Sequence, residues 1–150
     1  MKYNLLKTKI EPLKQWYCDY CGELIESPED GMLEWDTNEK LEAKNYRIVH
    51  GRWLKTCNVG KDDTHLSDGH LHWFLGDDGL INLLAHYHRY IVNFKEVNEI
   101  IRRLHIEYYE EARMYVQYAQ EDGLEIDPYS IGDLSRRDME FLIRKYKDRE

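Results

Sequence analysis

The sequence predicts an α+β protein, in which a small β-rich N-terminal part packs on a C-terminal bundle of about three helices. Residues 1–60 contain turn residues and short strand-like runs. Residues 77–150 instead carry apolar residues three or four positions apart, which is the spacing of one helical face. The length of 150 residues is common for one domain, and no repeat or Gly/Ser linker divides the chain. We therefore predict a single domain over residues 1–150.

Two segments of the first part have the composition of strands. Met32–Trp35 and Tyr46–Val49 are rich in the β-branched and aromatic residues that favour a sheet. The run Ser27–Gly31 before them is typical of a turn, because its proline presets φ and its glycine accepts a positive φ. The polar residues 36–45 are predicted to form a loop or one helical turn, and residues 61–76 a polar bridge.

Two helices are expected next. The first begins at Asp77 or Asp78, because a short carboxylate can accept hydrogen bonds from the free amides of the first turn. The second is longer, from about Glu96 to Gln120, since its apolar positions keep one helical spacing throughout. Gly123 follows where a helix naturally ends.

A third helix is predicted to begin near Ser135. Ser135 and Asp138 have the spacing of a capping box, in which two side chains bond reciprocally to the backbone of the first turn. Leu134 and Met139 have the positions of a hydrophobic staple across the same turn. These signals place the last helix of the chain close to its C-terminus.

Charge and hydropathy exclude some functions. The net charge is −8, and residues 61–150 contribute −7 of it, so no segment has the basic character of a duplex-binding protein. Direct nucleic-acid binding is therefore not expected. No apolar run reaches the roughly 20 residues of a membrane helix, and residues 1–7 do not resemble a signal peptide. We expect a cytoplasmic protein, whose oligomeric state the sequence does not predict.

The strongest local motif is the cysteine pair Cys18 and Cys21, followed by Gly22. Two cysteines separated by two residues can reach one metal ion from a tight turn, which is half of a tetrahedral zinc site. Cys57 supplies a third thiolate, and His50 ends the second predicted strand shortly before it. We therefore predict a structural Zn²⁺ bound by Cys18, Cys21, His50 and Cys57, in a β-rich module over residues 1–60 that is zinc-ribbon-like or treble-clef-like.

Other interpretations of the cysteines stay open. The pair could be a thioredoxin-like redox motif, although no βαβ unit surrounds it. The three cysteines could also be ordinary buried residues. A disulfide is disfavoured by their odd number in a chain without an export signal. The fourth ligand is also open, because three histidines follow Cys57, namely His65, His70 and His72.

Those three histidines suggest two catalytic alternatives. With a carboxylate from Asp62, Asp63 or Asp68 they could form a second metal centre. A His-Asn-His nuclease would instead use His50, Asn58 and His65 with a metal ion. Their spacing is short for such a site, and no helix is evident after Cys57. His86, His88 and His105 lie in predicted helices and are interpreted as surface or core residues.

Most of the chain is covered in patches by a further set of motifs, namely Trp16–Gly22, Gly31–Trp35, Arg47–His50, Cys57, His70–Leu80 and Glu110–Arg113. In these patches the chain resembles an uncharacterised family of small bacterial and phage proteins. The resemblance implies that the cysteines and His50 form a recurring metal motif, and it suggests a mobile-element origin.

These observations predict a zinc-stabilised, non-enzymatic binding protein that acts through a protein partner. If the chain is phage-derived, we expect a regulator or inhibitor whose acidic helices oppose a basic nucleic-acid-binding surface. Twelve tyrosines, many in the predicted helices, suit either a core edge or a binding face. The alternative function is a metal-dependent hydrolase or nuclease that uses the region from His50 to His72.

Overall fold

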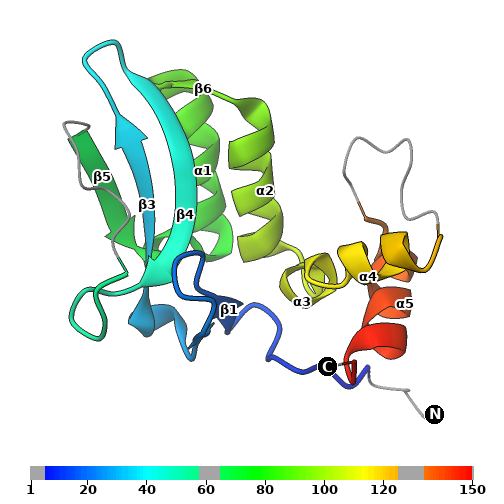
Figure 1. The fold of residues 1–150 in the computed structure, drawn as a ribbon. Coiled ribbons are helices and arrows are strands. Elements are labelled where there is room, and N and C mark those ends of the chain that lie inside the picture. Colours follow the sequence, from blue (N-terminus) through cyan, green and yellow to red (C-terminus); the bar gives the residue numbers. More distant parts are fainter. Residues whose placement is uncertain (1–5, 58–64, 125–133, 150) are drawn as a thin grey trace. The chain divides into compact units, whose positions relative to one another are not determined.

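A computed structural model describes residues 6–57, 65–124 and 134–149. They fall into two compact units, which are treated separately (Figure 1). One unit, called the sheet unit, comprises residues 13–106. The other, called the terminal unit, joins residues 1–12 to residues 107–150. The single domain expected from the sequence stays a prediction.

The sheet unit contains two small sheets. The first pairs two short antiparallel strands, β1 (Trp16–Tyr17) and β2 (Leu24–Ile25). The second has the strand order β5-β3-β4-β6, with β3 antiparallel to both of its neighbours and β6 parallel to β4. Its members are β3 (Gly31–Thr37), β4 (Glu42–His50), β5 (His65–His70) and β6 (Ile91–Val92).

Both predicted strands are present, and each is longer than expected. The strands β3 and β4 leave only residues 38–41 as their connecting loop, so most of the predicted loop belongs to the sheet. The polar bridge predicted for residues 61–76 was wrong at residues 65–70, which form the edge strand β5. This strand is rich in polar residues because it pairs on one side only, so its sequence lacks the apolar run of a buried strand.

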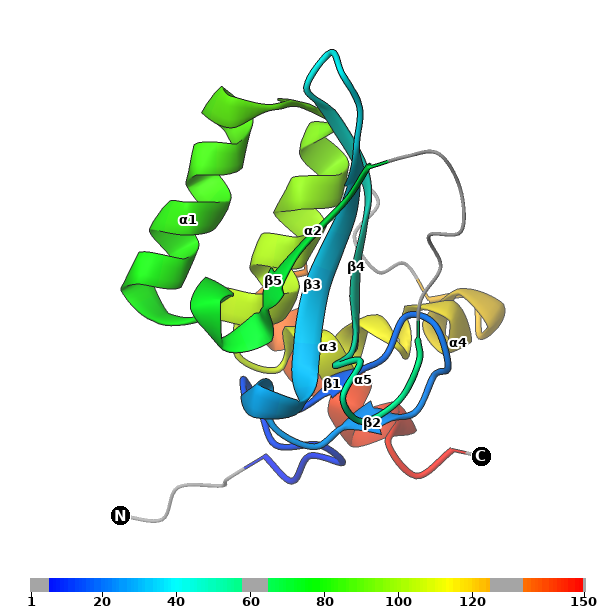
Figure 2. The same cartoon turned by 90° about the vertical axis from the view of Figure 1, so that its left-hand side faces the viewer.

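Two helices, α1 (Gly76–Arg89) and α2 (Phe94–His105), cover one face of the larger sheet (Figure 2). Two short 3₁₀ helices lie at Pro28–Asp30 and Leu71–Phe74. Asp77 and Asp78 lie within the first turn of α1, but its N-cap is Leu75, which makes no side-chain cap. The expected aspartate cap was therefore wrong. Buried apolar residues fill the space between sheet and helices, among them Leu33, Trp35, Ile48, Leu83, Ile100 and Leu104.

The long helix predicted from Glu96 to Gln120 was wrong. The helix α2 ends at His105, and Tyr108 has φ of +74°, which a continuous helix does not allow. Two short helices follow, α3 (Tyr109–Arg113) and α4 (Val116–Glu121). The same apolar spacing continues across the break, because the residues on both sides of it face a core. Those before the break pack in the core of the sheet unit, and those after it pack in the core of the terminal unit.

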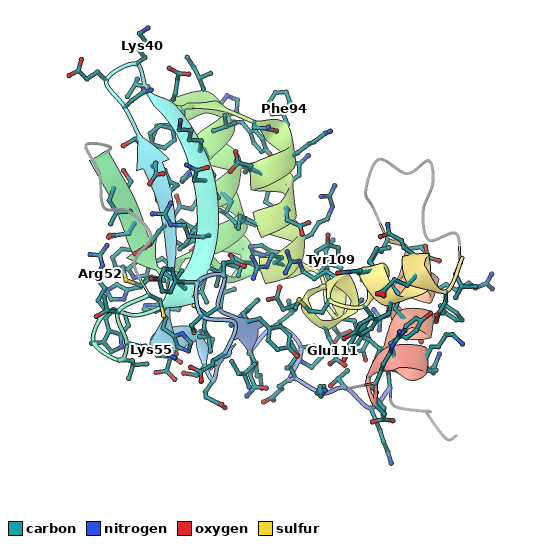
Figure 3. All side chains as sticks on the ribbon, in the orientation of Figure 1. Lys40, Arg52, Lys55, Phe94, Tyr109 and Glu111 are labelled. Atoms are coloured by element: carbon teal, nitrogen blue, oxygen red, sulfur yellow. The ribbon has the colours of Figure 1, made fainter. Side chains whose placement is uncertain are left out.

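The terminal unit packs α3 and α4 with a final helix, α5 (Arg136–Tyr146). The capping box of Ser135 and Asp138 is confirmed, with both reciprocal bonds present. Glu111 is buried and accepts hydrogen bonds from the backbone amides of Lys9 at 2.7 Å and Ile10 at 3.1 Å. The hydroxyl of Tyr115 donates to the same carboxylate at 2.9 Å. Glu111, labelled in Figure 3, thus fastens the N-terminal segment to α3.

The described residues form a mixed α/β fold with five α-helices and two small sheets. No helix among them is long and apolar enough to span a lipid bilayer.

Candidate metal centre

Four predicted ligands converge in the sheet unit. Cys18 and Cys21 lie in the turn between β1 and β2, His50 is the last residue of β4, and Cys57 lies in the loop after it. Their ligand atoms all lie within 4.8 Å of one another. Nδ1 of His50 is 3.5 Å from Sγ of Cys21 and 3.7 Å from Sγ of Cys57. With Zn–S bonds of about 2.3 Å, ligand atoms of a tetrahedral site lie about 3.8 Å apart, so the cluster has the dimensions of a metal site.

The turn that carries the first two cysteines is fixed by its backbone. The amide of Cys18 donates to the carbonyl of Glu23, and the amide of Gly22 donates to the carbonyl of Cys18, both at 2.9 Å. Gly22 has φ of +78°, a conformation that side chains other than glycine rarely adopt. The amide of Tyr20 points at Sγ of Cys18 over 3.4 Å.

The ring of His50 is oriented by a backbone carbonyl. Its Nε2 lies 3.1 Å from the carbonyl oxygen of Leu24, which can only accept a hydrogen bond. The proton of the neutral ring therefore sits on Nε2, and the lone pair of Nδ1 faces the sulfurs. A second hydrogen bond of this kind is the usual way in which a protein fixes the tautomer of a metal-binding histidine.

The loop that carries Cys57 is anchored by charged side chains. Arg52 donates to Glu34 at 3.1 Å and to Asp68 at 3.0 Å (Figure 3). Glu34 is fully buried and also pairs with Arg47, so Arg52 is tied to the interior of the sheet. This anchor was not predicted from the sequence, where its only signal was the acidic Glu34 between the apolar residues Leu33 and Trp35.

A second ion pair holds the same loop to the cysteine turn. Lys55 pairs with Glu23, which follows Gly22 in the turn. The amide of Gly51 donates to the carbonyl of Asp30 at 2.8 Å, just beyond the end of β4. The two halves of the cluster are therefore positioned by contacts that do not involve the sulfurs.

The thiols have unequal tendencies to ionise. Burial opposes ionisation of Cys21, but hydrogen bonds with Cys18 and Cys57, the charge that His50 carries when its ring is protonated, and a hydrogen bond with Lys55 lower its pKa below the ordinary value. Burial, reinforced by the hydrogen bonds and charges of the other two cysteines, raises the pKa of Cys57 to about 12. Three thiolates this close repel one another, so they ionise together only around a cation. The donor set of three sulfurs and one imidazole suits a borderline-soft cation such as Zn²⁺.

The structure brings His50, and neither His70 nor His72, to the cysteines. The rings of His70 and Trp73 lie 4.6 Å apart, and those of His70 and His72 lie 5.5 Å apart. Within the described residues, the cysteine cluster is the one group of three or more metal-binding side chains. The side chain of His65, with Asn58, Asp62 and Asp63, lies outside the described residues.

No disulfide joins the cysteines, which are all free. No family model matches the chain, and no curated protein or solved structure matches it significantly. The family resemblance of the sequence stays a prediction, and function is inferred from the site itself.

Proposed function

We propose that the chain is a zinc-stabilised, non-enzymatic binding protein, in which Cys18, Cys21, His50 and Cys57 hold one structural Zn²⁺. The observation that carries the proposal is the approach of four soft and borderline donors to within 4.8 Å. Three thiolates and one imidazole complete a tetrahedral first shell. A closed shell of this kind has no position for a substrate, unlike a catalytic zinc site with three protein ligands.

The ion would supply stability where the strands are very short. The strands β1 and β2 have two residues each, and a two-stranded hairpin is marginal without further support. Zinc binding is worth roughly 10–16 kcal/mol in zinc-finger peptides. That free energy would join the β1–β2 turn to the end of β4, as a zinc-ribbon-like or treble-clef-like module.

An exposed apolar surface supports a protein partner. Ile81 and Leu84 lie three residues apart on α1, hence on one helical face, and both are exposed. Phe94 and Ile91 are each 66% exposed, and the amide of Ile91 bonds to the carbonyl of exposed Leu41. Phe94 is labelled in Figure 3. Large apolar side chains exposed to solvent are common in protein–protein contacts, so we propose that the partner binds at these five residues, called the apolar strip: Leu41, Ile81, Leu84, Ile91 and Phe94.

Cobalt substitution tests the metal centre. We expect one zinc per chain by elemental analysis, and a tetrahedral, thiolate-rich spectrum when Co²⁺ replaces it. Adding azide or imidazole should leave the cobalt spectrum unchanged, because no coordination position is open. A spectrum that shifts on adding azide would favour the alternative, a metal-dependent hydrolase or nuclease that uses the region from His50 to His72.

The partner is tested with a tagged chain expressed in its native host. The variant Leu84→Glu should lose the proteins that co-purify stoichiometrically with the wild type. The matched control is Leu124→Glu, an exposed leucine of the terminal unit, which should retain them. Equal recovery with both variants would exclude the apolar strip as the docking surface.

A further inference from the structure

A pocket of about 390 Å³ lies in the sheet unit between the edge strand β5 and helix α1. Residues 67–69 of β5 form one wall, and Asn82, His86 and Arg89 of α1 form the other. Aromatic residues complete the lining, among them Trp35, Trp73, Phe74 and Tyr90. The volume is in the range of small-molecule sites. None of the proposed zinc ligands lines it.

The helical wall presents three hydrogen-bonding side chains in register. Asn82, His86 and Arg89 are spaced four and three residues apart, so they share one face of α1. Within the described residues, Asn82 and Arg89 have no hydrogen-bond or ion-pair partner. Arg89 is exposed, so its guanidinium is available to a ligand.

The ring of His86 adds a further donor. Its Nδ1 lies 2.7 Å from the hydroxyl of Tyr46, and the ring is almost wholly buried. Burial and the charge of Arg89 lower the pKa of His86 to about 4, so the ring is neutral. In the tautomer that carries its proton on Nε2, Nδ1 accepts from the hydroxyl of Tyr46 and Nε2 can donate to a ligand. Nε2 bonds to no described residue.

The side-chain acceptors that β5 contributes to the pocket are already engaged. The carboxylate of Asp68 binds Arg52 at 3.0 Å, and the hydroxyl of Ser67 pairs with that of Thr37 at 3.2 Å. The pocket thus combines unused donors on α1 with aromatic rings. The indole of Trp73 is about half exposed, so one ring is open for stacking.

We propose that this pocket binds a small aromatic carboxylate. Arg89 would pair with the carboxylate, Asn82 and His86 would donate to its oxygens, and the ring of the ligand would pack against Trp73 and Phe74. A cation with neighbouring donors is the usual arrangement for carboxylate recognition. This site is separate from the metal centre, so either proposal can fail while the other stands.

The test uses the full-length, zinc-loaded chain and four probes: benzoate, phenylacetate, uncharged benzamide and inorganic phosphate. Calorimetry should give saturable binding of at least one of the two aromatic acids below about 10 mM. Benzamide and phosphate should bind at least about tenfold more weakly, because each lacks half of the recognised chemistry. Amide and indole NMR signals of Trp35 and Trp73 should shift with the bound acid.

The variant Arg89→Gln should weaken binding of the acid about tenfold or more, since it removes the charged donor. Arg137→Gln is the matched control, because Arg137 is an exposed arginine of the terminal unit. The affinity of this variant for the acid should stay unchanged. Zinc content and the amide spectrum confirm that both variants are folded. Three results would each overturn the proposal: neither acid saturates, benzamide or phosphate binds as well as the tighter of the two acids, or Arg89→Gln binds that acid as well as the wild type does.

Discussion

Two regions of the chain are stabilised by different means. Trp16 and Ile25, in the two-residue strands beside the cysteine turn, are fully buried, and the turn and the loop after β4 are further held by ion pairs, among them that of Arg103 with Asp19, by backbone bonds and by four proposed ligands. The terminal unit instead has a conventional core of tyrosine and aliphatic side chains, with the buried carboxylate of Glu111 bonded to the N-terminal segment. Ligation can add to apolar burial where strands are very short, whereas a unit with enough apolar surface needs no ion.

The difference predicts different responses to loss of metal. We expect Cys18→Ser to lose zinc and to destabilise the sheet unit by at least about 4 kcal/mol, because three remaining ligands leave a weak site beside very short strands. Hydrogen exchange should show lost protection first in residues 16–57. His72→Ala is the control, since His72 lies outside the cysteine cluster, and it should keep one zinc per chain. Full protection in zinc-free Cys18→Ser would contradict a structural ion.

A substitution in the terminal unit should lower stability without changing the zinc content. We expect Glu111→Ala to lower the free energy of unfolding by about 3 kcal/mol, because the amides of Lys9 and Ile10 lose a charged acceptor. Zinc content should not change. Glu140→Ala is the control, because this glutamate makes only exposed pairs within α5 and should cost less than about 1 kcal/mol. Loss of zinc in Glu111→Ala would show that the two regions are not independent.

The sequence predicted the features that depend on local chemistry. Both central strands, the capping box at Ser135 and the set of three cysteines with His50 follow from residue type and spacing, and the structure contains each of them. The strands and the capping box are each determined by a few neighbouring residues, and the prediction of the metal site started from one local motif. The spacing of Cys18 and Cys21 already requires a turn that points both sulfurs the same way.

The features that were missed depend on distant partners. β5 is a strand because β3 offers it a pairing edge, which its own polar sequence does not reveal. The break at Tyr108 is equally non-local, because the residues before and after it keep one apolar spacing but belong to two cores. The pocket beside α1 joins β5 to that helix, so it could not be predicted while β5 was interpreted as a bridge.

A smaller effect is expected when the loop that carries Cys57 loses its anchor. We expect Arg52→Gln to weaken zinc binding about tenfold, because the loop that carries Cys57 loses its link to Glu34 and Asp68. A competition titration with a chelator measures the change. Arg144→Gln is the matched control, since Arg144 pairs only with exposed Glu140 in the terminal unit. Equal zinc affinity of both variants would mean that the sulfurs alone order the loop.

The smallest expected effect is the pH dependence of stability that His86 contributes, as distinct from the pH dependence that the metal ligands contribute. His86 has a pKa of about 4 in the folded chain and 6.5 as its ordinary value, so the unfolded chain takes up its proton first as the pH falls. The stability from the neutral ring is complete above pH 6.5 and is lost as the pH falls towards 4. Between pH 7.5 and 5.5, with zinc in excess, this loss amounts to about 1 kcal/mol.

Denaturant unfolding of His86→Gln, whose side chain does not titrate, should lack that component while keeping the acid sensitivity of the thiolates. If both proteins lose the same free energy over this range, the acid response belongs entirely to other groups, and the metal centre becomes its first candidate.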